Sequence, residues 1–463
     1  MPAILGSMTP RGEGFPIGVM AAGDFVPGDP RRGVYLGQGE GHRLIIGPPG
    51  SGKFTSVIAP LLLTADRDSA IVFDVANGEA ARQTGRHRAS LGPIFLLDPF
   101  LLGGAGTHRL NPLDILSADD PSILTKARRL ADALMIFGDQ GGESQYWNDQ
   151  ATNLMVALLL YVATDPSEEG NRTLKRVRQI IRQPLNPPVN PDDPWDNGSV
   201  LAAMRECRIA DNYVRDEVAS LTQAEAERNT MYVQLTLKAN TAFLDLPEVQ
   251  NVTSATTIDL SALRREVATL YVVVPEYELA TVARWLRLLY SVVMEQMRLI
   301  ADAGNARRLH VIMDEFPALG RFPRVKSDMA LTRKWGINFH VAVQSLEQLQ
   351  AIYRDGWQEF CGVSMYQQVL GANDLTTAKY VSDRLGTTTR PTTSESHDRR
   401  HAGGSRGQTR SWQEAPLMAP HQVTQMARER CVVLVEGSDP LSLRKWHYFE
   451  DPYLQARASR ALT

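Results

Sequence analysis

Short apolar runs recur along the chain, and turn-forming residues separate them. Most runs are continuous rather than alternating, which is the pattern of central parallel strands covered on both faces. Helical patterns lie between several runs, so the sequence predicts an α/β fold with a central, mostly parallel β-sheet. The expected strands are Arg43–Gly47, Ala70–Val75, Ile94–Asp98, Thr269–Pro275, Leu309–Asp314, Ile337–Val343 and Cys431–Val435.

Residues 117–256 show helical periodicity and few strand signals. We expect helices at Lys126–Phe137, Asn148–Thr164 and Ser220–Leu244. Prolines crowd residues 183–200, which excludes a helix there and favours a surface loop. The sequence therefore predicts an all-α domain inserted into the α/β domain.

A later segment, residues 387–414, is rich in Ser, Thr, Gly and Arg and has no apolar periodicity. We predict a flexible loop there. Its arginines leave two interpretations open, a solvated loop without a role or a loop that contacts DNA phosphates. They are Arg390, Arg399, Arg400, Arg406 and Arg410.

Composition narrows the class of protein. A formal net charge of -3 argues against a strongly basic nucleic-acid coat protein, although a ring-shaped motor can keep its positive charge on a pore lining. The three cysteines form no CxxC pair, so neither a disulfide framework nor a metal site is expected. No apolar run approaches the roughly 18 residues of a membrane span, and no signal peptide is apparent. We expect a cytoplasmic protein that can associate peripherally with the inner face of the membrane.

A glycine-rich loop directly follows the first apolar run and precedes a helical segment, in the pattern Gly-x4-Gly-Lys. Such a loop curls so that its N–H groups point at one centre, and Lys53 can reach the β- and γ-phosphates of a nucleotide. The alternative is a glycine-rich turn with a stray lysine, which the strand before it disfavours. The predicted nucleotide-binding residues are Gly47, Pro48, Pro49, Gly50, Ser51, Gly52, Lys53, Phe54 and Thr55.

The residue after the lysine departs from this pattern. Ser or Thr usually stands there and ligates Mg²⁺, but this chain has Phe54. Thr55 or Ser56 is left to supply a hydroxyl ligand, or water takes its place. This substitution affects how Mg²⁺ is coordinated but not the backbone N–H groups that bind the phosphates.

A second candidate element is the apolar run that ends in Asp314 and Glu315. Open α/β sheets bind ligands at the carboxyl ends of their strands. Asp314 is expected to hold Mg²⁺, and Glu315 is expected to orient and polarise the attacking water. An acidic strand end is common in α/β proteins, but together with the glycine-rich loop it indicates a nucleoside triphosphatase.

These residues resemble the coupling proteins of type IV secretion and conjugation systems. Residues 314–320, Asp-Glu-Phe-Pro-Ala-Leu-Gly, are similar to the signature of TraG-type members. The resemblance covers about residues 32–452. Further matches in the order of the family are Gly78-Glu79, Asp98-Pro99, Asn111-Pro112-Leu113-Asp114, Gln344-Ser345, Gln348-Leu349, Gly371-Ala372-Asn373-Asp374, Thr377-Ala378, Val433-Leu434-Val435-Glu436-Gly437 and Tyr448-Phe449-x-Asp451-Pro452.

The resemblance implies a RecA-like P-loop NTPase that is a homo-hexamer when active and can be a monomer in isolation. It implies hydrolysis of ATP with Mg²⁺ to recruit and translocate single-stranded DNA, nucleoprotein or effector, with channel subunits and the relaxosome as partners. The domains would be an extension (1–31), the first part of the nucleotide-binding domain (32–116), the all-α insert (117–256) and the second part (257–463).

Two further roles follow from matched positions. Arg333 stands where the family places an arginine finger, donated across a subunit boundary, and a planar cation suits the charge on the transferred phosphoryl group. The alternative is an arginine on a helix surface. Gln344 resembles the residue that senses the γ-phosphate, and the alternative is a polar cap on a strand end.

The chain also departs from the family. Most members carry an N-terminal membrane domain, which we do not expect here. The usual Asp-x-Lys-Gly-Glu motif lacks its lysine and has Asn77 before Gly78, and Ala415 stands where a basic residue is usual. Three hypotheses remain open: a secretion-coupled ATPase, a soluble DNA-translocating motor related to FtsK and HerA, and a non-hydrolysing scaffold that uses nucleotide as an assembly switch.

Overall fold

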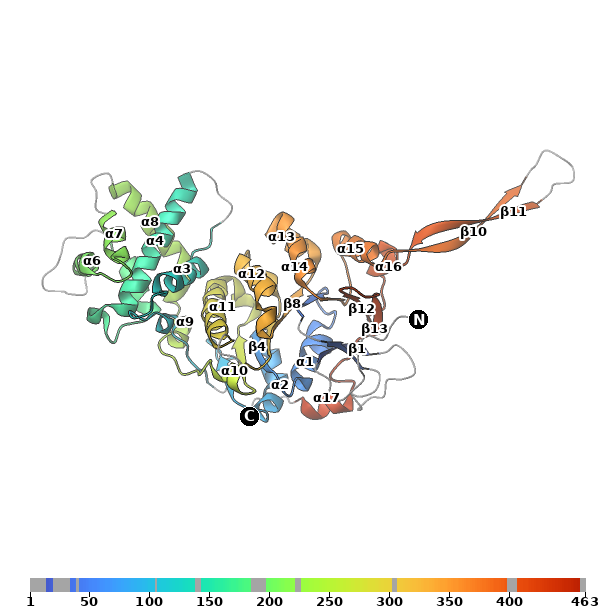
Figure 1. Cartoon of the computed structure of the whole chain (residues 1–463), viewed down its shortest axis with the longest axis horizontal. Coiled ribbons are helices and arrows are strands. Elements are labelled where there is room, and N and C mark those ends of the chain that lie inside the picture. Colours follow the sequence, from blue (N-terminus) through green and yellow to red (C-terminus); the bar gives the residue numbers. More distant parts are fainter. Residues whose placement is uncertain are drawn as a thin grey trace. The chain divides into compact units, whose positions relative to one another are not determined.

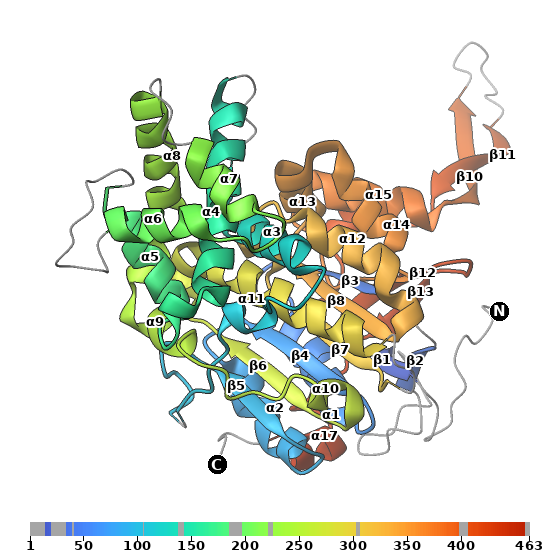
Figure 2. The same cartoon turned by 60° about the vertical axis from the view of Figure 1, so that its left-hand side comes forward.

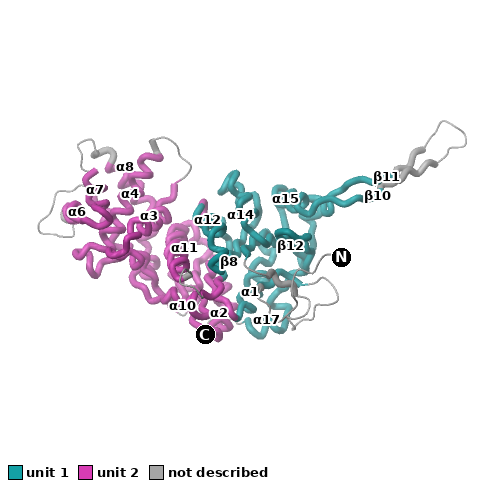
Figure 3. Tube along the Cα trace, in the orientation of Figure 1, with its two compact units in different colours: residues 1–66, 310–317, 323–459 teal, residues 67–309, 318–322, 460–463 magenta. Residues whose placement is uncertain are grey.

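The continuous apolar runs form buried strands in the computed structural model. It describes residues 14–19, 34–38, 41–104, 106–137, 143–184, 197–220, 226–301, 306–397 and 406–458. Figure 3 shows two compact units in this chain. Unit 1 comprises residues 1–66, 310–317 and 323–459, and unit 2 comprises residues 67–309, 318–322 and 460–463.

Unit 1 contains a sheet with parallel strands at its centre. β3 pairs in parallel with β8 on one side and with β9 on the other, and the β9–β12, β12–β13, β13–β1 and β1–β2 pairs are antiparallel. All residues of β3, β7 and β8 are buried, which explains why most of them are apolar. In sheet order the strands are β2 (Val34–Gln38), β1 (Gly14–Val19), β13 (Leu441–Arg444), β12 (Arg430–Val435), β9 (Tyr366–Val369), β3 (Arg43–Ile46), β8 (Ile337–Val343) and β7 (Leu309–Met313).

Helices cover both faces of this sheet. Figures 1 and 2 show α12 to α15 on one face and α1 with α17 on the other. A short π-helix, η1 (Phe54–Ile58), runs directly into α1. The helices of unit 1 are α1 (Ala59–Thr64), α12 (Pro323–Thr332), α13 (Leu346–Tyr353), α14 (Gln358–Val363), α15 (Leu375–Leu385), α16 (Pro420–Thr424) and α17 (Pro452–Arg457).

Unit 2 has three parallel strands, with β6 (Thr269–Val273) between β4 (Ser69–Asp74) and β5 (Ile94–Leu97). Between β5 and β6 the described residues contain helices and no strand, as expected for an all-α insert. The long α4 contacts α3, α5, α7 and α8, and its centre is fully buried. The helices of unit 2 are α2 (Glu79–Ala89), α3 (Ile123–Leu134), α4 (Glu143–Thr164), α5 (Leu174–Arg182), α6 (Asn197–Glu206), α7 (Tyr213–Ser220), α8 (Ala226–Asn240), α9 (Pro247–Val252), α10 (Ala262–Arg265) and α11 (Leu279–Ala301).

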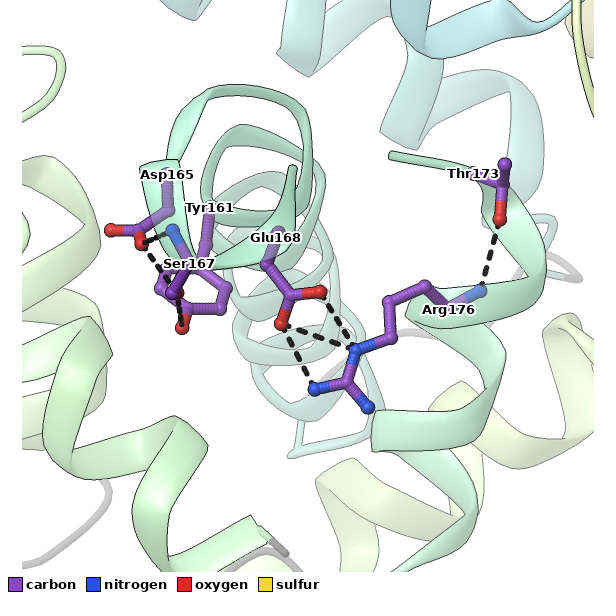
Figure 4. A network of polar contacts seen from close by, with 6 residues as sticks. All are labelled: Tyr161, Asp165, Ser167, Glu168, Thr173 and Arg176. Atoms are coloured by element: carbon purple, nitrogen blue, oxygen red, sulfur yellow. Dashed lines mark hydrogen bonds and ion pairs between the residues drawn. The ribbon is translucent and has the colours of Figure 1, made fainter. Parts of the chain in front are cut away.

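A buried ion pair fixes the turn between α4 and α5, as Figure 4 shows. Arg176 on α5 donates from Nε and Nη2 to the carboxylate of Glu168, whose side chain is 1% exposed. The carboxylate of Asp165 accepts the Ser167 N–H at 2.9 Å, and Thr173 caps the start of α5. Removing either partner of the ion pair would leave a buried charge unpaired, so this corner resists substitution.

All seven predicted strands are confirmed, with ends that differ by at most two residues. The predicted helices at 126–137 and 148–164 are confirmed as α3 and α4. The third ends earlier than predicted, because α8 stops at Asn240 and a 3-10 turn, Ala242–Asp245, follows. Most of the predicted proline-rich loop, residues 185–196, lies outside the described residues, but α6 begins at Asn197, so the predicted absence of a helix up to residue 200 is wrong. None of the described helices combines the length and the hydropathy needed to cross a bilayer.

The predicted flexible loop is wrong over the described residues 387–397 and 406–414. Two antiparallel strands, β10 (Thr387–His397) and β11 (Arg406–Pro416), pair along their whole length and project from unit 1 as a ribbon (Figures 1 and 3). Threonines, which favour extended backbone because they are β-branched, occupy five of the eleven positions of β10. Residues 398–405, with Arg399 and Arg400, lie outside the described residues.

Candidate nucleotide-binding site

The glycine-rich loop leaves β3 beside the end of β8. The Gly47 N–H donates to the Val343 carbonyl at 3.1 Å, and the Ser51 N–H donates to the Pro48 carbonyl at 3.1 Å. A Cβ atom on Gly47 would lie 2.4 Å from Ser51 Oγ and 3.0 Å from Leu370 Cβ. Glycine is therefore required at this position by close packing.

The middle of the loop needs backbone conformations that other residues avoid. Gly50 and Gly52 have φ of +72° and +90°. The Ser56 N–H donates to the Gly52 carbonyl at 2.9 Å, which starts the helical segment. Lys53 Nζ donates to the Gly47 carbonyl at 2.8 Å, so its ammonium bends back over the loop. These features give the curled backbone and inward cation that a phosphate cradle requires.

The three residues after Lys53 have their side chains engaged by the protein. Phe54 is buried, with its ring edge-on to Tyr448 at a centroid distance of 6.0 Å. Ser56 Oγ donates to the Gly52 carbonyl at 2.7 Å. Thr55 Oγ1 lies 2.9 Å from His447 Nδ1. Thr55 as a metal ligand stays a prediction, and its hydroxyl already has a protein partner.

The acidic pair follows β7 in a strained turn. Glu315 has φ of +56°, a conformation that non-glycine residues seldom adopt and that is frequent at functional sites. The next residue, Phe316, is 1% exposed and packs on the rings of Tyr353 and Phe360. This aromatic packing holds the turn, and both Asp314 and Glu315 stay partly exposed beside it.

A chain of hydrogen bonds joins Glu315 to the end of β8. Gln348, on α13, donates from Nε2 to Glu315 Oε1 at 3.1 Å. The Gln344 N–H donates to Gln348 Oε1 at 3.2 Å. Glu315 and Gln344 are therefore at the same edge of the sheet, where the Gly47 loop also begins. Since β8 lies between β3 and β7, strand spacing puts the ends of β3 and β7 about 10 Å apart.

Arg333 does not lie at the carboxyl ends of the strands, where Glu315 and Gln344 lie. It is exposed and lies in a 3-10 turn, Arg333–Trp335, just before β8, whereas Gln344 follows β8. The seven residues of β8 span about 23 Å. Within one chain the predicted finger therefore lies at the opposite edge of the sheet from the predicted phosphate site.

The donor set at the strand ends suits Mg²⁺ held together with nucleotide phosphates. Asp314 offers a carboxylate, the hard oxygen ligand that Mg²⁺ prefers. Among the described residues no cluster of three or more His, Cys, Asp or Glu side chains could hold a metal alone. Mg²⁺ commonly uses one or two carboxylates and completes its coordination with phosphates and water, so Asp314 fits this role.

Comparison with known proteins identifies the family of the chain. The profile described as "Type IV secretory system Conjugative DNA transfer" matches residues 11–462. The chain belongs to this conjugative DNA transfer family. This membership confirms the resemblance that the sequence motifs indicated.

Individual relatives agree with the family. The chain is 29% identical to VirD4 of Agrobacterium fabrum over 435 residues, which cover 91% of the chain and 61% of that protein. It is 25% identical to the type IV secretion system-coupling protein VirD4 of Bartonella quintana over 434 residues, covering 91% and 65%. The chain thus spans less than two thirds of the length of these relatives.

Among solved structures, the unbound conjugative coupling protein TrwBdeltaN70 is similar to the chain with a TM-score of 0.63. The sequences are 15% identical, and the match covers 88% of this chain and 84% of that one. The similarity confirms the predicted fold class, α/β with a central, mostly parallel sheet.

The altered family motif in unit 2 keeps an ordered turn. Asp74, at the end of β4, accepts the Ala81 N–H at 3.1 Å and the Ala76 N–H at 3.3 Å. Burial raises the pKa of Asp74 above its usual value. Asn77 and Gly78 both have positive φ, and Asn is among the residues that tolerate it. The missing lysine therefore leaves the turn intact.

Two contributions to the site were not assigned from the sequence. Gln348 was noted only as part of a family match, and its contact with Glu315 depends on how α13 packs after β8. His447 is distant from Thr55 in the sequence, and the two side chains meet only because the folded chain brings them together. The only sequence signal for Gln348 was its position four residues after Gln344. No sequence signal pointed to His447.

Proposed function

We propose that this chain hydrolyses ATP with Mg²⁺ and couples the reaction to recruitment and translocation of DNA, nucleoprotein or effector through a type IV secretion channel. The hydrogen-bonded chain from Glu315 through Gln348 to Gln344, beside the Gly47 loop, carries the proposal. TrwB has been solved with a non-hydrolysable ATP analogue and with ADP and Mg²⁺, which supports nucleotide binding in this fold.

Each residue of the site has a chemical task in this proposal. The Gly47 loop and Lys53 bind the phosphates, and Asp314 holds Mg²⁺. Glu315 accepts a hydrogen bond from Gln348, which aims its carboxylate so that the other oxygen can orient a water for attack on the γ-phosphate. Mg²⁺, when bound, neutralises charge on the β- and γ-phosphates. Gln344 would report the presence of the γ-phosphate to α13 through Gln348.

The site is incomplete without a second subunit. Because Arg333 is exposed and lies at the far edge of the sheet in its own chain, we place it in the site of a neighbouring chain within a homo-hexamer. Channel subunits and the relaxosome are the partners that the family indicates. The protein would move its substrate by cycling nucleotide around this ring.

The all-α part of unit 2 is where we place substrate recognition. A hollow of about 480 Å³ opens there between α3 and α4. Cationic and anionic side chains share its wall. The lining residues are Arg128, Asp132, Met135, Phe137, Asp149, Thr152 and Asn153.

Glu315→Gln tests the proposal. We expect ATP turnover to fall about 10²- to 10⁴-fold, because the amide cannot accept a proton from water, while ATP affinity stays near that of the wild type. Turnover is measured with and without single-stranded DNA, and ATP binding by calorimetry. Lys53→Ala is the companion variant and should lose ATP binding itself.

The outcomes separate the hypotheses. Turnover that single-stranded DNA stimulates supports a DNA motor. Wild-type protein that binds ATP but never hydrolyses it would establish the scaffold instead. Undiminished turnover in Glu315→Gln would refute the assignment of Glu315 as the residue that activates water.

A further inference from the structure

A short segment near the C-terminus, Lys445–Phe449, lies directly against the phosphate loop. Lys445 Nζ donates to the Ser51 carbonyl at 2.8 Å, and the Tyr448 N–H donates to the Thr55 carbonyl at 3.0 Å. His447 Nδ1 lies 2.9 Å from Thr55 Oγ1. The segment therefore contacts the loop and the start of the following helix at three separate points.

His447 also fits the loop sterically. A Cβ atom on Gly52 would lie 2.9 Å from His447 Cε1. The lack of a side chain at Gly52 thus serves two purposes, since its φ of +90° also favours glycine. The His447 ring therefore packs against the glycine and the threonine of the loop at the same time.

The buried side chain of Trp446 anchors the Lys445–Phe449 segment. Trp446 is 3% exposed and packs with Val19, Leu63 and Leu454 in a small apolar cluster. Its Nε1 donates to Asp451 Oδ2 at 2.9 Å. The residues before and after this anchor cannot shift without disturbing the cluster, so the ring positions of His447 and Phe449 are set by the fold.

The two rings above this anchor form a stack at the surface. His447 and Phe449 have centroids 5.1 Å apart and planes inclined by 25°. Phe449 is 49% exposed, whereas Phe54 is 8% exposed. An aromatic side chain that is positioned by its neighbours yet half exposed offers a flat apolar face to a ligand.

The order of the strands decides which part of a nucleotide would meet this face. Glu315 and Gln344 follow β7 and β8, on one side of β3. The Lys445–Phe449 segment follows β13, which lies on the other side, beyond β9 and β12. A triphosphate lying over the loop with its γ-phosphate toward Glu315 would direct its nucleoside toward the Lys445–Phe449 segment.

We propose that Phe449, backed by His447, is the platform on which the base of the bound nucleotide stacks. The proposal rests on the nucleotide-binding function proposed above and adds the subsite for the base. It predicts that the segment contributes to binding of a nucleoside triphosphate but not to binding of the phosphate chain alone.

Calorimetry on the full chain with two ligands, ATP and inorganic tripolyphosphate, tests the platform. Base stacking on an aromatic side chain contributes about 1–3 kcal/mol, so Phe449→Ala should weaken ATP binding roughly tenfold or more. The affinity for tripolyphosphate should stay unchanged. Phe449→Trp should restore ATP binding, and Phe449→Leu, which keeps apolar bulk without an aromatic face, should not.

Control variants make the outcomes distinct. Tyr277→Ala removes another exposed aromatic ring, 77% exposed and remote in sequence, and should change neither affinity. Lys53→Ala should lose both ligands. Equal weakening of both ligands in Phe449→Ala, or no change in either, would overturn the platform alone. Wild-type protein that binds neither ligand would overturn the proposed function and the platform with it.

Discussion

The central strands of unit 1 carry polar side chains at both ends. These side chains are partly exposed at the carboxyl ends and buried at the amino ends. At the carboxyl ends, Asp314, Glu315 and Lys53 are partly exposed. At the amino ends, His42 and Arg43 are 2% and 0% exposed and bond within the protein. One end presents its polar groups to a ligand, and the other uses them to hold the sheet together.

The buried end is closed by specific contacts. His42 Nδ1 accepts the Phe339 N–H at 3.1 Å, and Nε2 donates to the Met329 carbonyl, which fixes the neutral tautomer. Arg43 donates to the Pro16 carbonyl at 2.6 Å and lies 4.1 Å above the ring of Phe15. The comparison teaches that a polar residue at a strand end is functional only where the fold leaves it room to meet a ligand.

Arg333 tests the comparison most severely, because it is an exposed cation beside the buried amino ends of these strands. Arg333→Ala should slow ATP hydrolysis about 10³-fold, as expected on loss of an arginine finger, and should leave ATP affinity unchanged. Turnover and calorimetry on the same preparation measure the two effects. Lys334→Ala, the neighbouring exposed cation, is the matched control and should hydrolyse ATP normally.

Mixing variants shows whether Arg333 acts in a neighbouring chain. Arg333→Ala retains Glu315, and Glu315→Gln retains Arg333, so mixed rings would contain some complete sites. We expect the mixture to regain part of the turnover that each variant lacks. Normal hydrolysis by Arg333→Ala alone would make Arg333 a surface residue and leave the closed end purely structural.

The buried histidines predict how the closed end responds to acid. Burial lowers the pKa of His42 to about 4 from a usual value of 6.5, and burial also lowers that of His340. Above pH 6.5 neither the folded nor the unfolded state binds the proton, so the full stability is present. Between pH 6.5 and 4 only the unfolded state takes it up, and His42 alone should cost about 3 kcal/mol of folding free energy.

Urea unfolding at a series of pH values measures this loss. His42→Gln cannot take up a proton, so its stability should fall less steeply between pH 6.5 and 4, although lost contacts will lower its stability at pH 7.5. The exposed His421→Gln is the control and should keep the steep dependence of the wild type. Parallel curves for His42→Gln and the wild type would show that the acid response arises elsewhere.

The comparison also explains which parts of the fold were predictable. β3, β7 and β8 were found because every residue is buried and most are apolar. β9 was missed because Gln367 and Gln368 interrupt its pattern, although both are buried. Gln367 Nε2 donates to the Cys361 carbonyl and Gln368 Nε2 to the Ile17 carbonyl, both at 3.0 Å. Such amide contacts depend on tertiary partners, which a local pattern does not contain.

The site divides in the same way. Gly47 and Lys53 were recognised because a phosphate-binding loop demands those residue types at close spacing, and Glu315 was recognised because an acidic pair ends an apolar strand. The β10–β11 ribbon was read as a loop because its threonines were counted as polar rather than as β-branched. In the Lys445–Phe449 segment, Tyr448 and Phe449 were noted only as part of a family match. Their relation to the phosphate loop was missed because it bridges about 400 residues of sequence and arises only from strand order.

Substitution of Gln348 has the smallest expected effect on turnover and tests how the carboxyl ends of the strands position Glu315. Gln348→Ala removes the donor to Glu315 and the acceptor of the Gln344 N–H, so the carboxylate is less well aimed. A hydrogen bond to a charged group is worth about 1.5–3 kcal/mol, and we expect kcat to fall roughly tenfold or somewhat more while KM for ATP changes little.

The control is Gln350→Ala, an exposed glutamine on the same helix, which should leave kcat unaltered. Gln348→Glu sharpens the result, because it keeps an acceptor for Gln344 but sets a second carboxylate against Glu315. If aiming Glu315 is what matters, Gln348→Glu should be slower than Gln348→Ala, and its turnover should recover as the pH is lowered enough to protonate one carboxyl group of the pair. Equal kcat in both variants and the wild type would mean that Glu315 is positioned by its own strained backbone alone, and the open end would then need no support from α13.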